Sequence, residues 1–212
     1  MKQVIYLSLL LIALTGCSFN DEKSVAAKTS ASNTIPSYYD EYILNPQVSD
    51  DRLLQEAGQF SRDHRGELTV KSAELDSHTY KIGSSIELTI KEAKILHFKP
   101  DYSLIDFYHS YTHDQEFDFV KFFVEIKNTS NQSLKFAPIA ILHTSASEEA
   151  TFEDDIYLED LNGEIAANGT KKGNLGFIID KSNVDSMEIR TSDVFNEKDE
   201  IISDSKTIRV EF

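Results

Sequence analysis

The stretch FDFVKFFVEIKNTSNQSLKF, from Phe117 to Phe136, decides the fold, because two apolar runs flank a polar turn. Its first run alternates with a period of two, which is typical of a β-strand. One face carries Val120, Phe122, Val124 and Ile126, and the other carries Lys121, Glu125 and Lys127. Residues 128–131, Asn-Thr-Ser-Asn, favour a chain reversal because such side chains bond to nearby backbone. The stretch therefore predicts a β-hairpin.

Length and composition predict one domain that is stabilised by packing. The chain has 212 residues, 40% of them hydrophobic, and a single cysteine, so no intrachain disulfide can form. A body of roughly 130–150 residues between the termini suits a single all-β unit. We expect a signal peptide at 1–16, a tether at 17–48, a helix at 49–66 and a β domain at 67–212.

The N-terminus has the pattern of an export signal. Lys2 precedes an apolar run from Val4 to Leu14, which is too short to span a membrane but suits a signal peptide. The sequence Leu14-Thr15-Gly16-Cys17 resembles the lipobox of bacterial lipoproteins, in which the peptide is cut before an acylated cysteine. The resemblance implies lipidation at Cys17 and a lipid-anchored protein on the extracytoplasmic face of the cell membrane. A plain secretory signal with an incidental cysteine is the alternative.

Net charge limits the partners of the mature chain. Removal of residues 1–16 leaves 20 basic and 36 acidic residues, a net charge of −16. Such a chain is repelled by nucleic acid and favours cationic partners, although negative charge also serves solubility. We therefore expect no nucleic-acid partner.

The segment before the β domain divides into three parts. Residues 18–33 are small and polar and predict a flexible tether. Residues 35–47 contain three tyrosines and enough apolar area either to dock on the domain or to bind an external partner. From Ser49 to Gly66, a capping serine, acidic start, basic end and terminal glycine predict an amphipathic helix packed on the domain's side.

Short alternating strands follow from Glu67 onward. A shift of apolar phase predicts a bulge near Lys91 and Glu92, and Asp101 to Glu116 predicts a long aromatic loop with a short helical turn. The acidic run from Glu148 to Asp155 predicts a solvated loop rather than a calcium site, because it lacks the alternation of a calcium-binding loop. The second strand of the hairpin is expected to end at Ile139–Leu142, and further strands are expected at Ile156–Leu158, Leu175–Ile179, Met187–Ile189 and Ile208–Phe212.

Three segments together resemble a widespread bacterial lipoprotein domain of unknown function. They are Lys81-Ile82-Gly83-Ser84 with the strand Ile86–Ile90, the strand Phe119–Ser130, and the turn and strand Asn168–Phe177. The resemblance spans roughly residues 67–212. It implies an immunoglobulin-like antiparallel β-sandwich, grouped with secreted immunoprotective antigens of Gram-positive bacteria, and it brings no catalytic residues.

The best candidate for a ligand site is the aromatic loop, through Tyr108, His109, Tyr111 and His113. The two histidines are four residues apart, which places both imidazoles on one face, with Asp114 and Glu116 nearby. Zinc sites need three or four protein ligands, so an exposed polar and aromatic loop is the preferred interpretation and no metal or other cofactor is predicted. A metal-binding envelope lipoprotein using His109 and His113 is the alternative function.

No pattern in the sequence supports an enzyme. The only cysteine is expected to carry the anchor, and no Gly-x-Ser-x-Gly elbow or phosphate-binding loop occurs. We therefore predict a non-catalytic binding module that meets a protein or peptide partner through loops at one end of the sandwich. The strand from Phe117 is expected to lie centrally in its sheet, with its outer phenylalanines covered by residues 53–60 or 38–44.

Overall fold

The computed structural model describes residues 34–180 and 183–212. The predicted signal peptide, Cys17 and the first part of the tether lie outside the described residues. Within the described range, no helix is long and apolar enough to cross a membrane.

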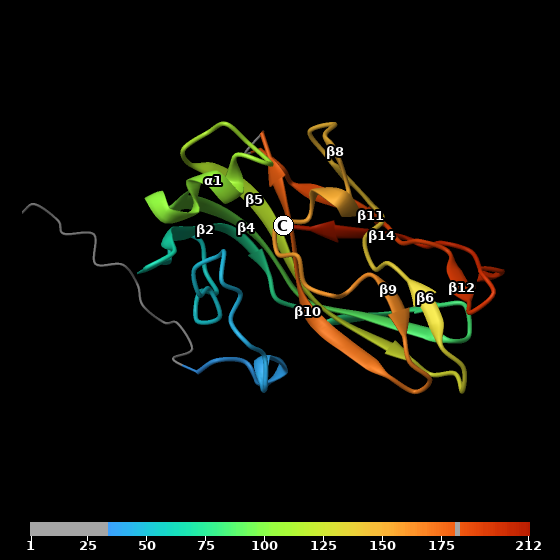
Figure 1. Ribbon diagram of the computed structural model, residues 1–212. Helices are drawn as coiled ribbons and strands as arrows, with labels where there is room; N and C mark the ends of the chain where they lie inside the picture. The colour runs from blue at the N-terminus through green and yellow to red at the C-terminus, as the bar shows by residue number, and fades with distance from the viewer. Residues whose placement is uncertain (1–33, 181–182) are drawn as a thin grey trace, which may run out of the picture. The chain divides into compact units, whose positions relative to one another are not determined.

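The largest sheet is antiparallel and is built around two long strands (Figure 1). Its strand order is β1-β2-β4-β5-β10, with β3 paired to β4. The strands are β1 (Phe60–Asp63), β2 (Gly66–Glu74), β3 (His78–Ile82), β4 (Ile86–Pro100), β5 (Phe117–Asn128) and β10 (Thr170–Ile179). The central position of β5 is thus confirmed, and the register of β4 and β5 shifts between Ile90 and Glu92, as the change of apolar phase predicts.

Two four-stranded antiparallel sheets complete a sandwich with the large sheet. One has the order β14 (Thr207–Glu211), β11 (Ser186–Arg190), β7 (Ile141–Thr144) and β8 (Glu149–Thr151). The other has the order β13 (Ile201–Ser203), β12 (Val194–Asn196), β6 (Leu134–Phe136) and β9 (Gly163–Ile165). Apolar side chains from all three sheets form one core, which confirms the predicted mainly-β sandwich.

The predicted hairpin from Phe117 to Phe136 is wrong. β5 pairs with β4 and β10, whereas β6 pairs with β9 and β12 in another sheet. The polar turn carries the chain from one sheet to the other. Asn128 is fully buried there, and its side-chain amide donates to the carbonyls of Gln132, Ile165 and Ala166. These tertiary bonds decide the partner of each strand, which a local alternation of apolar residues does not specify.

The predicted helix at 49–66 is also wrong, and residues 60–63 of it form β1 instead. Side chains bond the local backbone in its place: Asp50 accepts from the Arg52 amide, and Gln59 accepts from the amides of Gln55 and Glu56. Such bonds compete with helical ones. Gly58 adopts a φ of 85°, which a helix does not allow.

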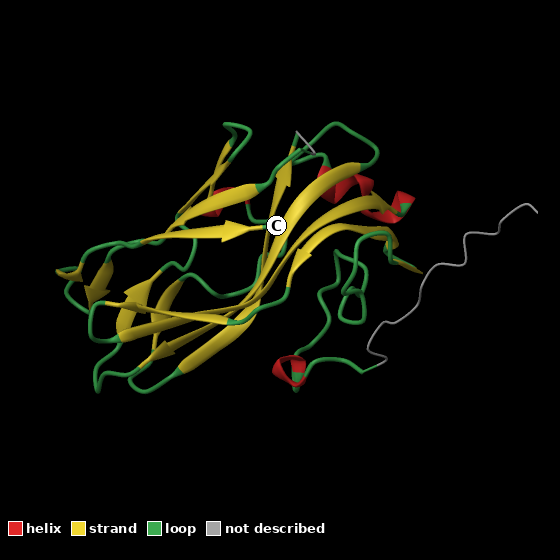
Figure 2. Ribbon diagram, turned by 180° about the vertical axis from the view of Figure 1, so that it is seen from behind, coloured by secondary structure: helices red, strands yellow, loops and turns green. Residues whose placement is uncertain are grey.

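The helices that the structure describes are short. They are η1 (Ser37–Tyr39), η2 (Tyr102–Leu104), α1 (Ile105–Tyr108) and η3 (Phe152–Asp154). The second and third fall in the aromatic loop, where a helical turn is predicted. Figure 2 shows the N-terminal segment and α1 on one side of the large sheet and the two smaller sheets on the other.

The outer face of the large sheet, away from the shared core, is also buried. Its apolar side chains include Leu68, Leu96, Phe98, Phe117 and Phe119, packed against Tyr108, Ile156 and Tyr157. The rings of Tyr38, Tyr39 and Tyr42 pack on Phe123 with centroid distances of 5.5, 4.3 and 5.5 Å. Residues 35–47 therefore dock on the domain, and their tyrosines cover an outer phenylalanine as predicted.

Candidate functional site

The aromatic loop keeps its two histidines together but buries one of its tyrosines. His109 and His113 are both exposed, and their ring centroids lie 6.2 Å apart. Tyr108 is only 1% exposed and its hydroxyl donates to the carbonyl of Gln47, so it belongs to the outer-face core. Tyr111 is half-buried, and its hydroxyl donates to the carbonyl of Asp155. Only the two histidines of the four predicted residues are free to meet a ligand.

The described residues contain no group of three or more His, Cys, Asp and Glu side chains placed to hold a metal ion. This applies to His109 and His113, which have no third ligand beside them. The pair alone does not provide the coordination that zinc sites in proteins require.

A groove of about 590 Å³ lies beside the aromatic loop, where β5 begins and β4 and β10 end. Polar residues from three strands and two loops line it, together with Phe117, Ile178 and Ile179: Lys71, His97, Asp114, Glu116, Asp118 and Asp180. At neutral pH these comprise four carboxylates, one lysine and one histidine. The excess of negative charge fits a ligand that carries positive charge.

Asp118 is the centre of a fixed trio within the groove. His97 and Asp118 are cross-strand partners on β4 and β5, and His97 Nδ1 lies 2.7 Å from Asp118 Oδ1. Lys71 lies at a bulge of β2 and donates from Nζ to Asp118 Oδ2 at 2.8 Å. Because Nδ1 is held by the carboxylate, Nε2 of His97 is the ring nitrogen left for a ligand. The sequence shows none of this, because Lys71, His97 and Asp118 belong to three different strands.

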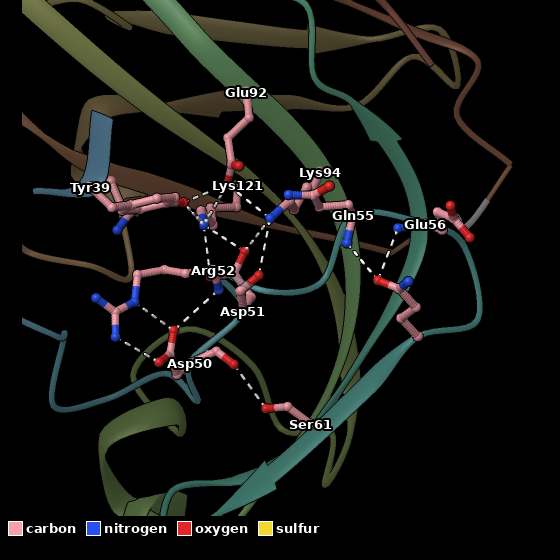
Figure 3. A network of polar contacts seen from close by, with 12 residues as sticks. Tyr39, Asp50, Asp51, Arg52, Gln55, Glu56, Ser61, Glu92, Lys94 and Lys121 are labelled. Atoms are coloured by element: carbon pink, nitrogen blue, oxygen red, sulfur yellow. Dashed lines mark hydrogen bonds and ion pairs between the residues drawn. The ribbon is translucent and has the colours of Figure 1, made fainter. Parts of the chain in front are cut away.

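A second polar cluster lies buried on the outer face of the large sheet. Lys94 of β4 and Lys121 of β5 face each other in the register, and both side chains are 0% exposed. Asp51 bridges them: its Oδ2 lies 3.0 Å from Lys94 Nζ and 2.6 Å from Lys121 Nζ (Figure 3). Glu92 pairs with the same two ammonium groups through Oε1 at 3.0 and 2.9 Å. The cluster is thus neutral overall, with two charges of each sign.

Two tyrosines complete this cluster. Tyr38 and Tyr39 donate to the two oxygens of Glu92 at 2.6 and 2.5 Å, and Lys121 donates to the Tyr39 hydroxyl at 2.7 Å. Burial alone raises the pKa of Asp51, but the two lysines outweigh it and lower that pKa to about 2. Burial likewise lowers the pKa of Lys121, but Asp51 and Glu92 reverse this and raise it. Asp51 and Lys121 therefore stay charged at neutral pH.

The alternation in the sequence places Lys121 on the outer face of its strand but does not predict this cluster. The sequence does hold a signal that could have found it. Lys121 shares its strand face with Phe117, Phe119 and Phe123, and a face with three phenylalanines needs cover. A lysine within that face must then be buried and paired.

Asp155 and Glu159 form a third feature, at the edge of the large sheet. Residues 156–158 are not a strand, contrary to the prediction, and they run beside the open edge of β10. Asp155 Oδ1 accepts from the amides of Gly176 and Tyr157 at 2.8 and 3.1 Å, and Glu159 Oε2 accepts from the Asn174 amide at 2.8 Å. These carboxylates satisfy strand-edge groups that another strand would otherwise pair.

Burial raises the pKa of Asp155 to about 6, against the opposing effect of its amide donors. Burial likewise raises the pKa of Glu159. Asp155 is only 4% exposed, so the predicted solvated acidic loop does not extend to its last residue. The loop itself contains β8 and η3.

The fold and these sites define a mainly-β antiparallel sandwich with a charged groove at one end of its large sheet. The chain belongs to the family described as Domain of unknown function (DUF4352), whose model matches residues 58–201. It is also similar to YdhF of Bacillus subtilis, an uncharacterized protein, with 40% identity over 237 residues covering 100% of both chains. The prediction of a domain of unknown function is thereby confirmed.

A solved structure shares the fold. A functionally unknown protein from Listeria monocytogenes aligns with 16% identity and a TM-score of 0.50, covering 69% of this chain and 87% of that chain. At this identity the likeness concerns the fold alone. The lipobox and the immunoglobulin-like relationship stay predictions.

Proposed function

We propose that this protein is a lipid-anchored extracytoplasmic binding module without catalytic activity, which uses the groove beside the aromatic loop. The observation that carries the proposal is the groove itself, with its volume of about 590 Å³ and its His97–Asp118–Lys71 trio. Its volume lies in the range of known ligand sites, although its lining is more polar than is usual for them. The apolar floor at Phe117 and Ile178 adds area for contact beside the charged groups.

The ligand class follows from the lining. Four carboxylates against one lysine favour a cationic group, such as the amine or guanidinium of a protein or peptide. No serine, threonine or cysteine lines the groove, so the described residues around it offer no hydroxyl or thiol nucleophile. A binding role accounts for the groove without a reaction.

Anchoring through Cys17 places the groove outside the cytoplasmic membrane. A diacyl anchor holds a protein stably because each buried methylene contributes about 0.8 kcal/mol. Cells that express the wild type should incorporate labelled palmitate into the protein, and Cys17→Ala should abolish it. Persistent labelling of the variant would remove the anchoring half of the proposal.

Site-specific photocrosslinking on intact cells tests the binding half. A photoreactive residue at Glu116, on the groove, should trap a discrete partner, and Asp118→Asn in the same chain should reduce that product strongly. The matched control places the photoreactive residue at Asp160, whose side chain is 91% exposed and lies outside the groove lining. Equal products from both positions would show that the groove does not select a partner.

A further inference from the structure

The strongest unassigned feature is the way residues 36–57, here called the covering segment, lie against the outer face of the large sheet. The backbone–backbone hydrogen bonds of residues 36–56 are all local turns, such as those from Tyr39 to Pro36 and from Leu54 to Asp51. Bonds between the covering segment and the sheet instead involve side chains, including those of Tyr38, Tyr39 and Asp51. The segment therefore docks as a bound peptide does, and it adds no strand.

The part of the sheet beneath the covering segment carries a net charge. Lys94, Lys121 and Glu92 all project from β4 and β5 and are at most 1% exposed. These three residues carry a net charge of +1, and the carboxylate of Asp51 neutralises it. Asp51 is the one member of the four-charge cluster that comes from the covering segment (Figure 3).

The energetics indicate selectivity. A buried ion pair contributes little net stability compared with an apolar group of the same volume, because desolvation offsets the attraction. It does discriminate strongly, since a buried charge without its partner is costly. Two lysines that meet both oxygens of one carboxylate at 2.6 to 3.0 Å accept that group and reject a neutral side chain.

We propose that Lys94, Lys121 and Glu92 form a carboxylate-binding site for an extended peptide, and that the covering segment is its exchangeable, built-in occupant. The expected ligand is a peptide with an aspartate that is preceded by tyrosines. The tyrosine hydroxyls donate to Glu92, and the tyrosine rings pack on Phe123. The DUF4352 match begins at residue 58, so it does not include the covering segment. The segment joins the domain through residues 56–58, which are exposed, so a protease can reach the link. The bonds that cross the link run between Gln59 and residues 55–56 and lie outside the cluster of Asp51 with the two lysines.

The test uses the full chain with a specific protease site inserted between Ala57 and Gly58. Ala57 and Gly58 are both exposed, so the inserted residues can extend into solvent. After cleavage the domain should stay folded, and a fluorescent synthetic peptide of residues 36–57 should exchange into it. The intact chain should not bind that peptide, because its own segment occupies the site.

Two peptide variants identify the recognised group. Asp51→Asn in the peptide should weaken binding by roughly a hundredfold or more, from the cost of leaving buried charge unpaired. Asp50→Asn is the matched control, because among the described residues the carboxylate of Asp50 pairs with Arg52 of the same segment and with no residue of the sheet. Its affinity should stay within about tenfold of the parent peptide, because the ion pair of Asp50 is with Arg52 and not with the two lysines that hold Asp51. Unfolding of the domain on cleavage, or equal affinity of both variants, would overturn the proposal.

A second measurement leaves the chain uncut. Asp51→Ala should lower the melting temperature, and acetate should restore part of it by placing a small carboxylate between the two lysines. Chloride at equal ionic strength should not do so, and Asp50→Ala should show no difference between the two anions. Equal effects of acetate and chloride on Asp51→Ala would show that no carboxylate site exists.

Discussion

The two faces of the large sheet are both buried, but by different means. The inner face packs mainly apolar side chains against the smaller sheets, among them Phe122, Val124 and Leu175. The outer face mixes phenylalanines with two buried lysines and is covered by loops and the covering segment. The stability of an apolar face depends on how well its side chains fill the available volume. The stability of a face with buried charges depends on whether every charge is paired.

Breaking the pairing on the outer face should have the largest effect. Lys121→Met leaves Asp51 and Glu92 as two buried carboxylates with one lysine, so we expect a loss of about 3–5 kcal/mol in the free energy of unfolding. Urea unfolding measures it. Lys127→Met, on the same strand but exposed, is the control and should change stability by less than about 0.5 kcal/mol. Equal stability of the two variants would show that the buried charges need no pairing.

Asp155 lies at the edge of the large sheet, and its pKa predicts how its contribution to stability depends on pH. Its pKa is raised to about 6, so the folded state binds its proton more tightly than the unfolded state does. Its contribution to stability is therefore complete below about pH 4 and is lost as the pH rises through 6, by about 3 kcal/mol at most. Asp155→Asn keeps an oxygen acceptor without the charge.

The variant should accordingly be more stable than the wild type at pH 7.5, and the difference should vanish near pH 4. Unfolding curves across this pH range measure the difference. Stability curves that stay parallel from pH 4 to 8 would contradict the raised pKa.

Asp51 predicts the opposite dependence on pH. Its pKa is lowered to about 2, so its contribution is complete above about pH 4 and is lost as the pH falls through 2. The corresponding free energy is about 2 kcal/mol. The stability difference between the wild type and Asp51→Asn should shrink over this interval. A constant difference from pH 5 to pH 2 would show that the ionised carboxylate is not what the lysines hold.

The same contrast explains what the sequence could predict. Strands such as β4 and β10 follow from local alternation, and the bulge at Lys91 follows from a change of apolar phase. The choice of partner for β6 does not follow, because distant groups around Asn128 decide it. The prediction of a helix at 49–66 is wrong for a related reason. The position of Asp51 is set by Lys94 and Lys121, which are more than 40 residues away in sequence.

The candidate sites show the same limit. The neighbouring rings of His109 and His113 follow from their spacing alone, and the structure brings them together. The central trio of the groove forms only when β2, β4 and β5 lie side by side, because Lys71, His97 and Asp118 come from these three strands. Spacing along one element is visible in a sequence, whereas convergence of several elements is visible only once the sheet is formed.

The smallest effect is expected in the groove. His97→Ala removes a ring that is 38% exposed, and Asp118 keeps its bond to Lys71. Exposed pairs of this kind contribute about 0–1 kcal/mol, so the unfolding free energy should fall by no more than that. Phe119→Ala, one residue from Asp118 and fully buried, should cost about 3–5 kcal/mol in the same assay. A loss at His97 as large as that at Phe119 would mean that the trio holds the sheet together. A small loss would show that the fold does not depend on His97, as expected for a side chain that is held for a ligand.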